Sequence, residues 1–141
     1  MVKNDKKKNS SFANRSKARS IALQILYQEE LNPGSDSEFS ETYIDEQLPK
    51  NEPLRVFCRR LVSGTRLHAK DLDEKILGVA KNWSLDRMAA TDRNILRLAV
   101  YEMQHLDTPR VVVINEAVEL AKTFGSNDSA SFVNGILDKI R

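Results

Sequence analysis

The sequence predicts an all-α fold, a bundle of about six or seven helices, on the strength of three observations. Apolar residues recur three and four positions apart through most of the chain, which is the spacing of helices that bury one face. Only residues 111–114, VVVI, have strong strand character, and the sequence has no internal repeat. The length of 141 residues fits one domain with a single core.

The N-terminal part predicts an arm followed by a helix. Residues 1–14 offer almost nothing to bury, so we expect a flexible basic arm there and one helical domain over residues 15–141. From Lys17 to Leu31 the apolar residues fall at helical spacing. Asn-Pro-Gly at 32–34 then ends the helix with turn chemistry.

The middle of the chain predicts further helices. A short acidic helix fits residues 35–47, and Pro49 and Pro53 mark the break after it. Apolar residues keep helical spacing over residues 54–82, a pattern that fits either one long helix or two.

Two later helices have recognisable ends. Ser84 is a plausible N-cap for a helix over residues 85–104. Thr108-Pro109 leads into a helix that ends at Phe124, where Gly125 suits a left-handed cap.

The last helix carries an aromatic residue away from its apolar stripe. It starts near Asn127 or Asp128, whose side chains can accept hydrogen bonds from free backbone N–H groups. At about 100° per residue, Phe132 lies about 100° from the centre of the stripe, close to Gly135. Such a ring suits stacking on a nucleic-acid base, and it equally suits packing under a neighbouring helix or the arm. The stripe consists of Ala130, Val133, Ile136, Leu137 and Ile140.

Composition excludes several classes of protein. Apolar residues make up 40% and charged residues 30%, and no segment approaches the roughly 20 consecutive apolar residues that span a bilayer. The first residues lack the apolar stretch of a secretory signal, and the single Cys58 cannot form an internal disulfide. We therefore expect a cytoplasmic protein that is not embedded in a membrane.

Charge is distributed unevenly along the chain. Residues 1–20 contain seven basic residues and one acidic residue, whereas the rest contains 15 basic and 19 acidic residues. A basic end attracts polyanions such as nucleic acid, because each neutralised phosphate releases counterions. A solvated tail that aids solubility is the alternative interpretation.

Candidates for catalysis are sparse, so we expect no enzyme, no metal and no cofactor. Cys58 lies on the apolar face of its helix, where a thiol usually behaves as a small hydrophobe. The two histidines lack a metal-binding context, and no Gly-rich nucleotide motif is present. Glu116 and Glu119 resemble a carboxylate pair, but Lys122 follows, which favours a solvated, ion-paired helix face.

Asp92 is unusual because it falls within an apolar arc of its helix, beside Ile95, Leu96 and Ala99. A carboxylate there needs a partner. The partner is either an intramolecular hydrogen bond or salt bridge, or a group on another protein.

Four segments together resemble the NusB family of bacterial transcription antitermination factors. They are SKARSIALQILYQ (16–28), TDRNILRLAVYEM (91–103), VVINEAVELAKTFG (112–125) and DSASFVNGILDKI (128–140). The resemblance implies a compact bundle of about seven helices in two packed subdomains, without catalytic activity. It also implies a heterodimer with NusE, a small-subunit ribosomal protein, and binding to the single-stranded boxA sequence in the leader RNA of ribosomal RNA operons. The assembly lets RNA polymerase read through terminators.

The resemblance also implies site residues. The family's N-terminal arginine-rich segment contacts RNA and matches Arg15, Lys17 and Arg19, and its RNA-facing aromatic matches Phe132. Asp128 matches a functionally sensitive acid of the family, and Asp92 matches an acidic position at the NusE contact.

Two departures from the family pattern bear on RNA affinity. Ser131 stands where the family usually has a lysine, and NRSKAR contains fewer arginines than the family's typical run.

Two alternatives to an RNA-binding antitermination factor are open. One is a module that mediates only protein contacts, and the other is a counterpart of the NusB-like domain of some RNA methyltransferases. A methyltransferase would need a further cofactor-binding domain, so we expect no such activity.

Overall fold

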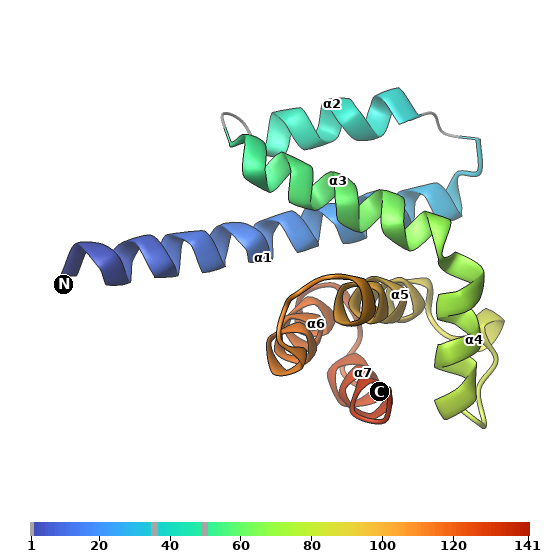
Figure 1. The fold of residues 1–141 in the computed structure, drawn as a ribbon. Coiled ribbons are helices and arrows are strands. Elements are labelled where there is room, and N and C mark those ends of the chain that lie inside the picture. Colours follow the sequence, from blue (N-terminus) through green and yellow to red (C-terminus); the bar gives the residue numbers. More distant parts are fainter. Residues whose placement is uncertain (1, 35–36, 49–50) are drawn as a thin grey trace. The chain divides into compact units, whose positions relative to one another are not determined.

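The structure is a computed structural model that describes residues 2–34, 37–48 and 51–141; for residues 2–13, 37 and 38 it describes the backbone alone. Within these ranges it has seven α-helices, one 3-10 helix and no strand (Figure 1). The prediction of an all-α fold with about seven helices is therefore confirmed. The helices are α1 (Val2–Leu31), α2 (Ser37–Gln47), α3 (Glu52–Leu67), α4 (Ala69–Val79), η1 (Leu85–Arg87), α5 (Ala90–His105), α6 (Arg110–Phe124) and α7 (Ser129–Leu137).

The chain forms two compact units, Met1–Val62 and Ser63–Arg141, which agree with the expected two subdomains. The helix predicted from Lys17 is the C-terminal half of α1, which begins at Val2. The backbone of residues 2–13 is helical, and their side chains lie outside the described part. The flexible arm over 1–14 and the single domain over 15–141 stay predictions.

In the first unit, α2 is joined to both of its neighbours by polar side chains. The Tyr43 hydroxyl donates to Gln24 Oε1 of α1 at 2.8 Å, and Arg59 Nε of α3 donates to Glu41 Oε2 at 2.8 Å. The apolar stripe of α1 is buried, as its spacing predicts, although Tyr27 at its edge is exposed. The buried stripe comprises Ala18, Ile21, Ala22, Ile25 and Leu26.

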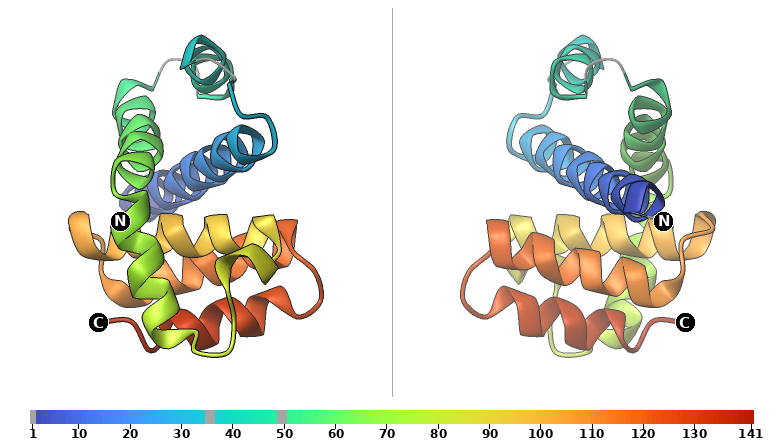
Figure 2. Two further views of the ribbon diagram at one scale, coloured as in Figure 1. Left: turned by 90° about the vertical axis from the view of Figure 1, so that its right-hand side faces the viewer. Right: turned by 90° about the vertical axis from the view of Figure 1, so that its left-hand side faces the viewer.

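In the second unit, α5, α6 and α7 run side by side in a stack (Figure 2). Two arginines link helices of this unit. Arg97 on α5 forms a two-pronged bridge to Asp73 of α4, at 2.6 and 3.1 Å. Arg110 at the start of α6 donates to the carbonyls of Leu137 and Asp138 at the end of α7. The bridge from Arg97 to a carboxylate is bidentate, which adds geometric specificity as well as energy. The two bonds from Arg110 tie the start of α6 to the end of α7.

The continuous helical spacing over residues 54–82 corresponds to two helices, α3 and α4, with His68 at the junction. The helix predicted for residues 85–104 is also divided, into η1 and α5, with extended backbone at Met88 and Ala89. Arg93 stabilises this break in the helix, because its guanidinium donates to the carbonyls of Leu85 and Met88 at 3.2 and 2.6 Å. Ser84 stands at the predicted N-cap position, but the helix that it precedes is η1 and its side chain forms no capping hydrogen bond.

Gly125 ends α6 as predicted, but not in a left-handed conformation. Its φ is −94°, and within the described residues the glycine with positive φ is Gly34, at 97°, in the turn after α1. Gly125 is needed for space: a Cβ there would overlap the side chain of Ser129 and lie 2.7 Å from the Ala121 carbonyl oxygen. The close approach of the α6–α7 connection to the end of α6 therefore selects glycine.

Among the residues that the structure describes, no helix is long and apolar enough to cross a membrane.

Candidate functional site

Phe132 lies on α7 outside the buried stripe, as the helical periodicity predicts. Val133, Ile136 and Leu137 are buried, whereas Phe132 is half-buried. Its ring meets the edge of Trp83, with ring centres 5.6 Å apart and planes inclined by 68°. Edge-to-face contacts of this kind are favourable because the positive rim of one ring faces the negative face of the other.

Trp83 was not identified from the sequence. It lies between α4 and η1, where its backbone N–H donates to the Ala80 carbonyl at 3.0 Å in a turn. Its side chain is 50% exposed, although tryptophan has the largest apolar surface to bury. The available signal was that Trp83 is the only tryptophan in the chain and stands outside every apolar helical stripe.

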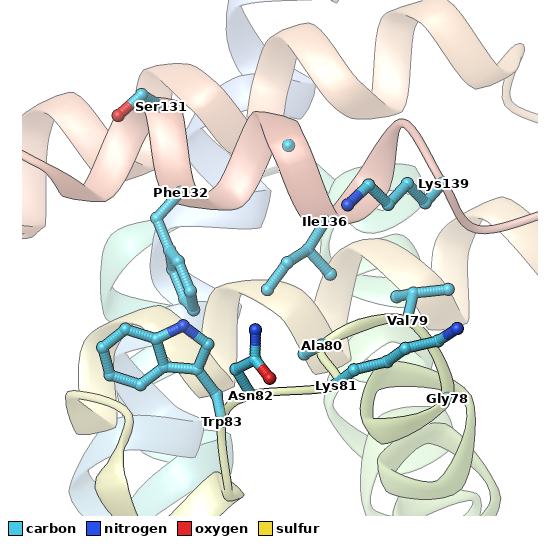
Figure 3. A pocket seen from close by; sticks show the side chains of 11 residues that line it. Gly78, Val79, Ala80, Lys81, Asn82, Trp83, Ser131, Phe132, Ile136 and Lys139 are labelled. Carbon is cyan, nitrogen blue, oxygen red and sulfur yellow. The ribbon is translucent and has the colours of Figure 1, made fainter.

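Phe132 and Trp83 both line a cavity of about 740 Å³ in the second unit, and their rings touch at one side of it. One wall is residues 78–83, the end of α4 and the loop after it, and the other is one side of α7 (Figure 3). Lys81 and Lys139 also line it, and both are exposed. Among the described residues that form these walls there is no acid, so the cavity is basic as well as aromatic.

Asp128 and Ser131 lie at the start of α7. Asp128 is exposed at the N-cap position, but its side chain forms no capping hydrogen bond, which corrects the predicted cap. Ser129, the first residue of α7, instead bonds to the connection before the helix, since its Oγ accepts from the Ser126 backbone N–H at 2.9 Å. The Ser131 hydroxyl donates to the Asp128 carbonyl at 3.1 Å, and Ser131 lines the cavity without contributing charge.

The three basic candidates near the N-terminus belong to the first unit, and they differ in exposure. Arg15 and Lys17 are exposed, whereas Arg19 is only 3% exposed. The guanidinium groups of Arg15 and Arg19 both lie over the Phe57 ring, at 5.0 and 5.3 Å from its centre. The two arginines therefore contact the same aromatic ring, but only Arg15 is accessible to solvent.

Asp92 is in the first turn of α5 and is 8% exposed. The sequence left open whether Asp92 bonds within the chain or to another protein. Its Oδ1 atom has no hydrogen-bond partner among the described residues, so no intramolecular bond satisfies that atom. A buried oxygen without a partner has a desolvation cost of about 1–3 kcal/mol.

The residues with no assigned function are placed mostly as expected. Cys58 is fully buried, which agrees with its interpretation as a small hydrophobe. Lys122 pairs with Glu119 at 3.3 Å on the exposed face of α6, as predicted. Glu116, however, is only 7% exposed, so its assignment to the same solvated face is wrong.

The fold and the cavity define an all-helical protein of two units whose second unit presents an aromatic and basic hollow. Comparison with known proteins identifies it further. The NusB family model matches residues 16–141, and the chain belongs to the NusB family. The transcription antitermination protein NusB of Geobacter sulfurreducens is 45% identical over 123 residues, covering 86% of this chain and 89% of that protein.

Solved structures of the family have the same fold. NusB of T. maritima superposes with a TM-score of 0.78 at 35% identity, covering 89% of this chain and 88% of that chain. A crystal structure of the antitermination factors NusB and NusE in complex with double-stranded RNA gives a TM-score of 0.78 at 29% identity, covering 89% and 94%. The family suggested by the sequence motifs is thereby confirmed.

Proposed function

We propose that this protein is a transcription antitermination factor that binds the boxA leader RNA of ribosomal RNA operons together with NusE. It acts in the cytoplasm, within the antitermination complex of RNA polymerase, by assembly rather than catalysis. The observation that carries the proposal is the basic, aromatic cavity around Phe132 in a chain of the NusB family. Sequence-specific recognition of RNA relies on unpaired bases that stack on aromatic side chains, and this surface offers both rings and charge.

The basic residues of α1 supply affinity. Arg15 and Lys17 are exposed and can reach phosphate oxygens, which position an RNA without reading its sequence. Arg19 is buried against Phe57, and its burial argues for a role in shaping this part of α1 rather than in direct RNA contact. Asp128 is exposed at the start of α7, where its carboxylate can accept hydrogen bonds from base amino groups.

We propose that the Asp92 carboxylate accepts a hydrogen bond from NusE. A buried carboxylate oxygen without a partner in the isolated chain gains one when a donor from another protein reaches it. We expect Asp92→Asn to weaken NusE binding while leaving the binding of RNA to the isolated chain unchanged. Titration calorimetry with purified NusE measures the effect, and Asp107→Asn, an exposed acid after α5, is the matched control. Equal NusE affinity in both variants would remove Asp92 from the interface.

A NusB-like module that lacks boxA specificity is the alternative, and Ser131 favours it. The position carries no charge, and its hydroxyl is bonded to the backbone of its own helix. Such a protein would bind boxA and a scrambled RNA equally.

The deciding experiment is a binding titration of boxA RNA and a scrambled control, each with and without NusE. The proposal expects tighter binding to boxA than to the scrambled RNA and a larger preference when NusE is present. Equal affinities under both conditions would support an RNA-targeting module without boxA specificity, and no RNA binding under either condition would support a module that mediates only protein contacts.

A further inference from the structure

We propose that Trp83 and Phe132 form a two-ring platform on which one unpaired nucleobase stacks, with Lys81 and Lys139 beside its phosphates. This inference rests on the proposed RNA function and adds to it a tryptophan, two lysines and a stacking geometry.

The arrangement of the two rings determines where a base can lie. Their centres are 5.6 Å apart and their planes are inclined by 68°, so the rings already touch and no base fits between them. A base must therefore stack on an open ring face, as a third member of the group. Trp83 has such a face, because its side chain is 50% exposed and lines the cavity.

The exposure of Trp83 is itself informative. A tryptophan left half in water forgoes much of the free energy that its burial would contribute. The turn hydrogen bond from its N–H to Ala80 holds the backbone at this position, and contact with Phe132 holds one edge of the ring. The ring is thus held in place while half of its surface is open, which is the arrangement that a stacking platform needs.

The charges around the cavity distinguish a nucleotide from an apolar peptide side chain. Lys81 projects from the loop wall and Lys139 from the end of α7, and the described lining residues include no acid (Figure 3). Asn82, between Lys81 and Trp83, offers both a donor and an acceptor to a base edge. The volume of about 740 Å³ lies within the range of small-ligand sites, as a site for one nucleotide requires.

The platform selects single-stranded RNA. Bases within a duplex are already stacked on their neighbours, and the open ring face can be used only by a base that has left such a stack. A duplex can still bind the lysines through its phosphates, but it cannot cover the Trp83 ring.

Trp83 provides its own measurement, because it is the only tryptophan in the chain. The full-length protein is titrated with a single-stranded boxA oligonucleotide while tryptophan emission is recorded and binding is measured independently by filter retention. We expect quenching of Trp83 with the same midpoint as filter binding, and little quenching by a duplex of the same sequence. An oligonucleotide series with one abasic site at each position is then expected to lose quenching at a single position.

Variants separate the rings from the fold. We expect Phe132→Leu and Trp83→Leu each to weaken single-stranded RNA binding by about 5- to 100-fold, the loss for one stacking contact, with Trp83→Phe retaining most of the affinity. Phe124→Leu is the matched control, because Phe124 is an exposed aromatic of the same unit that does not line the cavity. Thermal melting of each variant shows whether it remains folded.

The possible outcomes separate the two proposals. RNA that binds by filter retention without quenching Trp83, or that quenches equally as a duplex, would overturn the platform and leave the proposed RNA function standing. Unchanged affinity in folded Trp83→Leu would also overturn it. Absence of binding to every RNA would instead refute the proposed function on which the platform rests.

Discussion

The guanidinium of Arg19 lies 5.3 Å from the centre of the Phe57 ring, and it is almost completely buried there. Arg15, one helical turn earlier, lies 5.0 Å from the same ring but is exposed. Two basic residues with the same side chain and the same aromatic contact thus differ in access to solvent. A buried cation over a ring contributes more to stability than an exposed one, whereas an exposed cation can reach a phosphate.

Separate substitution of the two arginines tests this difference. We expect Arg15→Ala to lower RNA affinity and to reduce the slope of log affinity against log salt by about one, with an unchanged melting temperature. We expect Arg19→Ala to cost about 1–2 kcal/mol of unfolding free energy, because it removes the cation–π contact and the packing of a buried stem. Filter binding at several salt concentrations and thermal melting measure the two effects.

Lys122→Ala is the control for loss of one positive charge, since Lys122 is exposed and already paired with Glu119. If the slope of log affinity against log salt falls only for Arg19→Ala and not for Arg15→Ala, the phosphate contact belongs to Arg19.

Ser131→Lys is expected to strengthen RNA binding. The substitution places a third lysine on the wall of the cavity, where Ser131 now donates only to the carbonyl of Asp128. Each additional phosphate contact steepens the salt slope by about one. Thr123→Lys is the matched control, because Thr123 is also exposed and bonded to its own helix but does not line the cavity. An equal gain for both variants would indicate general attraction rather than a contact at the cavity.

Gly64→Ala is expected to destabilise the protein even though alanine is the better helix former. A Cβ at Gly64 would overlap the ring of Tyr101, which is buried and stacks on His105 with ring centres 5.0 Å apart. Because the Tyr101 ring is buried and stacks on both His68 and His105, moving it disturbs these contacts, and we expect a loss of about 1–3 kcal/mol in unfolding free energy. Gly78→Ala is the control, since open space surrounds that position and a gain of about 0.5–1 kcal/mol is expected. Urea denaturation measures both changes.

The Cys58 thiol is expected to be inert in the folded protein. Burial raises its pKa from the ordinary value of 9.0 to about 12, against the opposing influence of nearby Arg59. The folded state therefore holds this proton more tightly than the unfolded chain does. The corresponding stabilisation is fully present below about pH 9 and is lost as the pH rises to about 12. A thiol reagent at pH 8 should react only after denaturant is added, and rapid labelling of the native protein would contradict the burial.

Helical periodicity was sufficient to locate most of the fold and one feature of the site. The spacing in α1 and α7 predicts which faces are buried, and it places Phe132 beside the stripe of α7. Breaks that depend on a hydrogen bond from one particular side chain were not predictable in this way. The division of η1 from α5 is held by Arg93, whose donation to two carbonyls has no counterpart in the apolar pattern.

By itself the sequence determined the helical class, the course of the apolar faces, the basic N-terminal segment and, through its motifs, the NusB family. Only the tertiary structure decided that Phe132 meets Trp83, that a basic cavity forms between their segments, and that Arg19 is buried while Arg15 is exposed. The physical reason is that periodicity follows from the geometry of one helix. Contact and exposure depend on which other segment, far along the chain, packs against that helix.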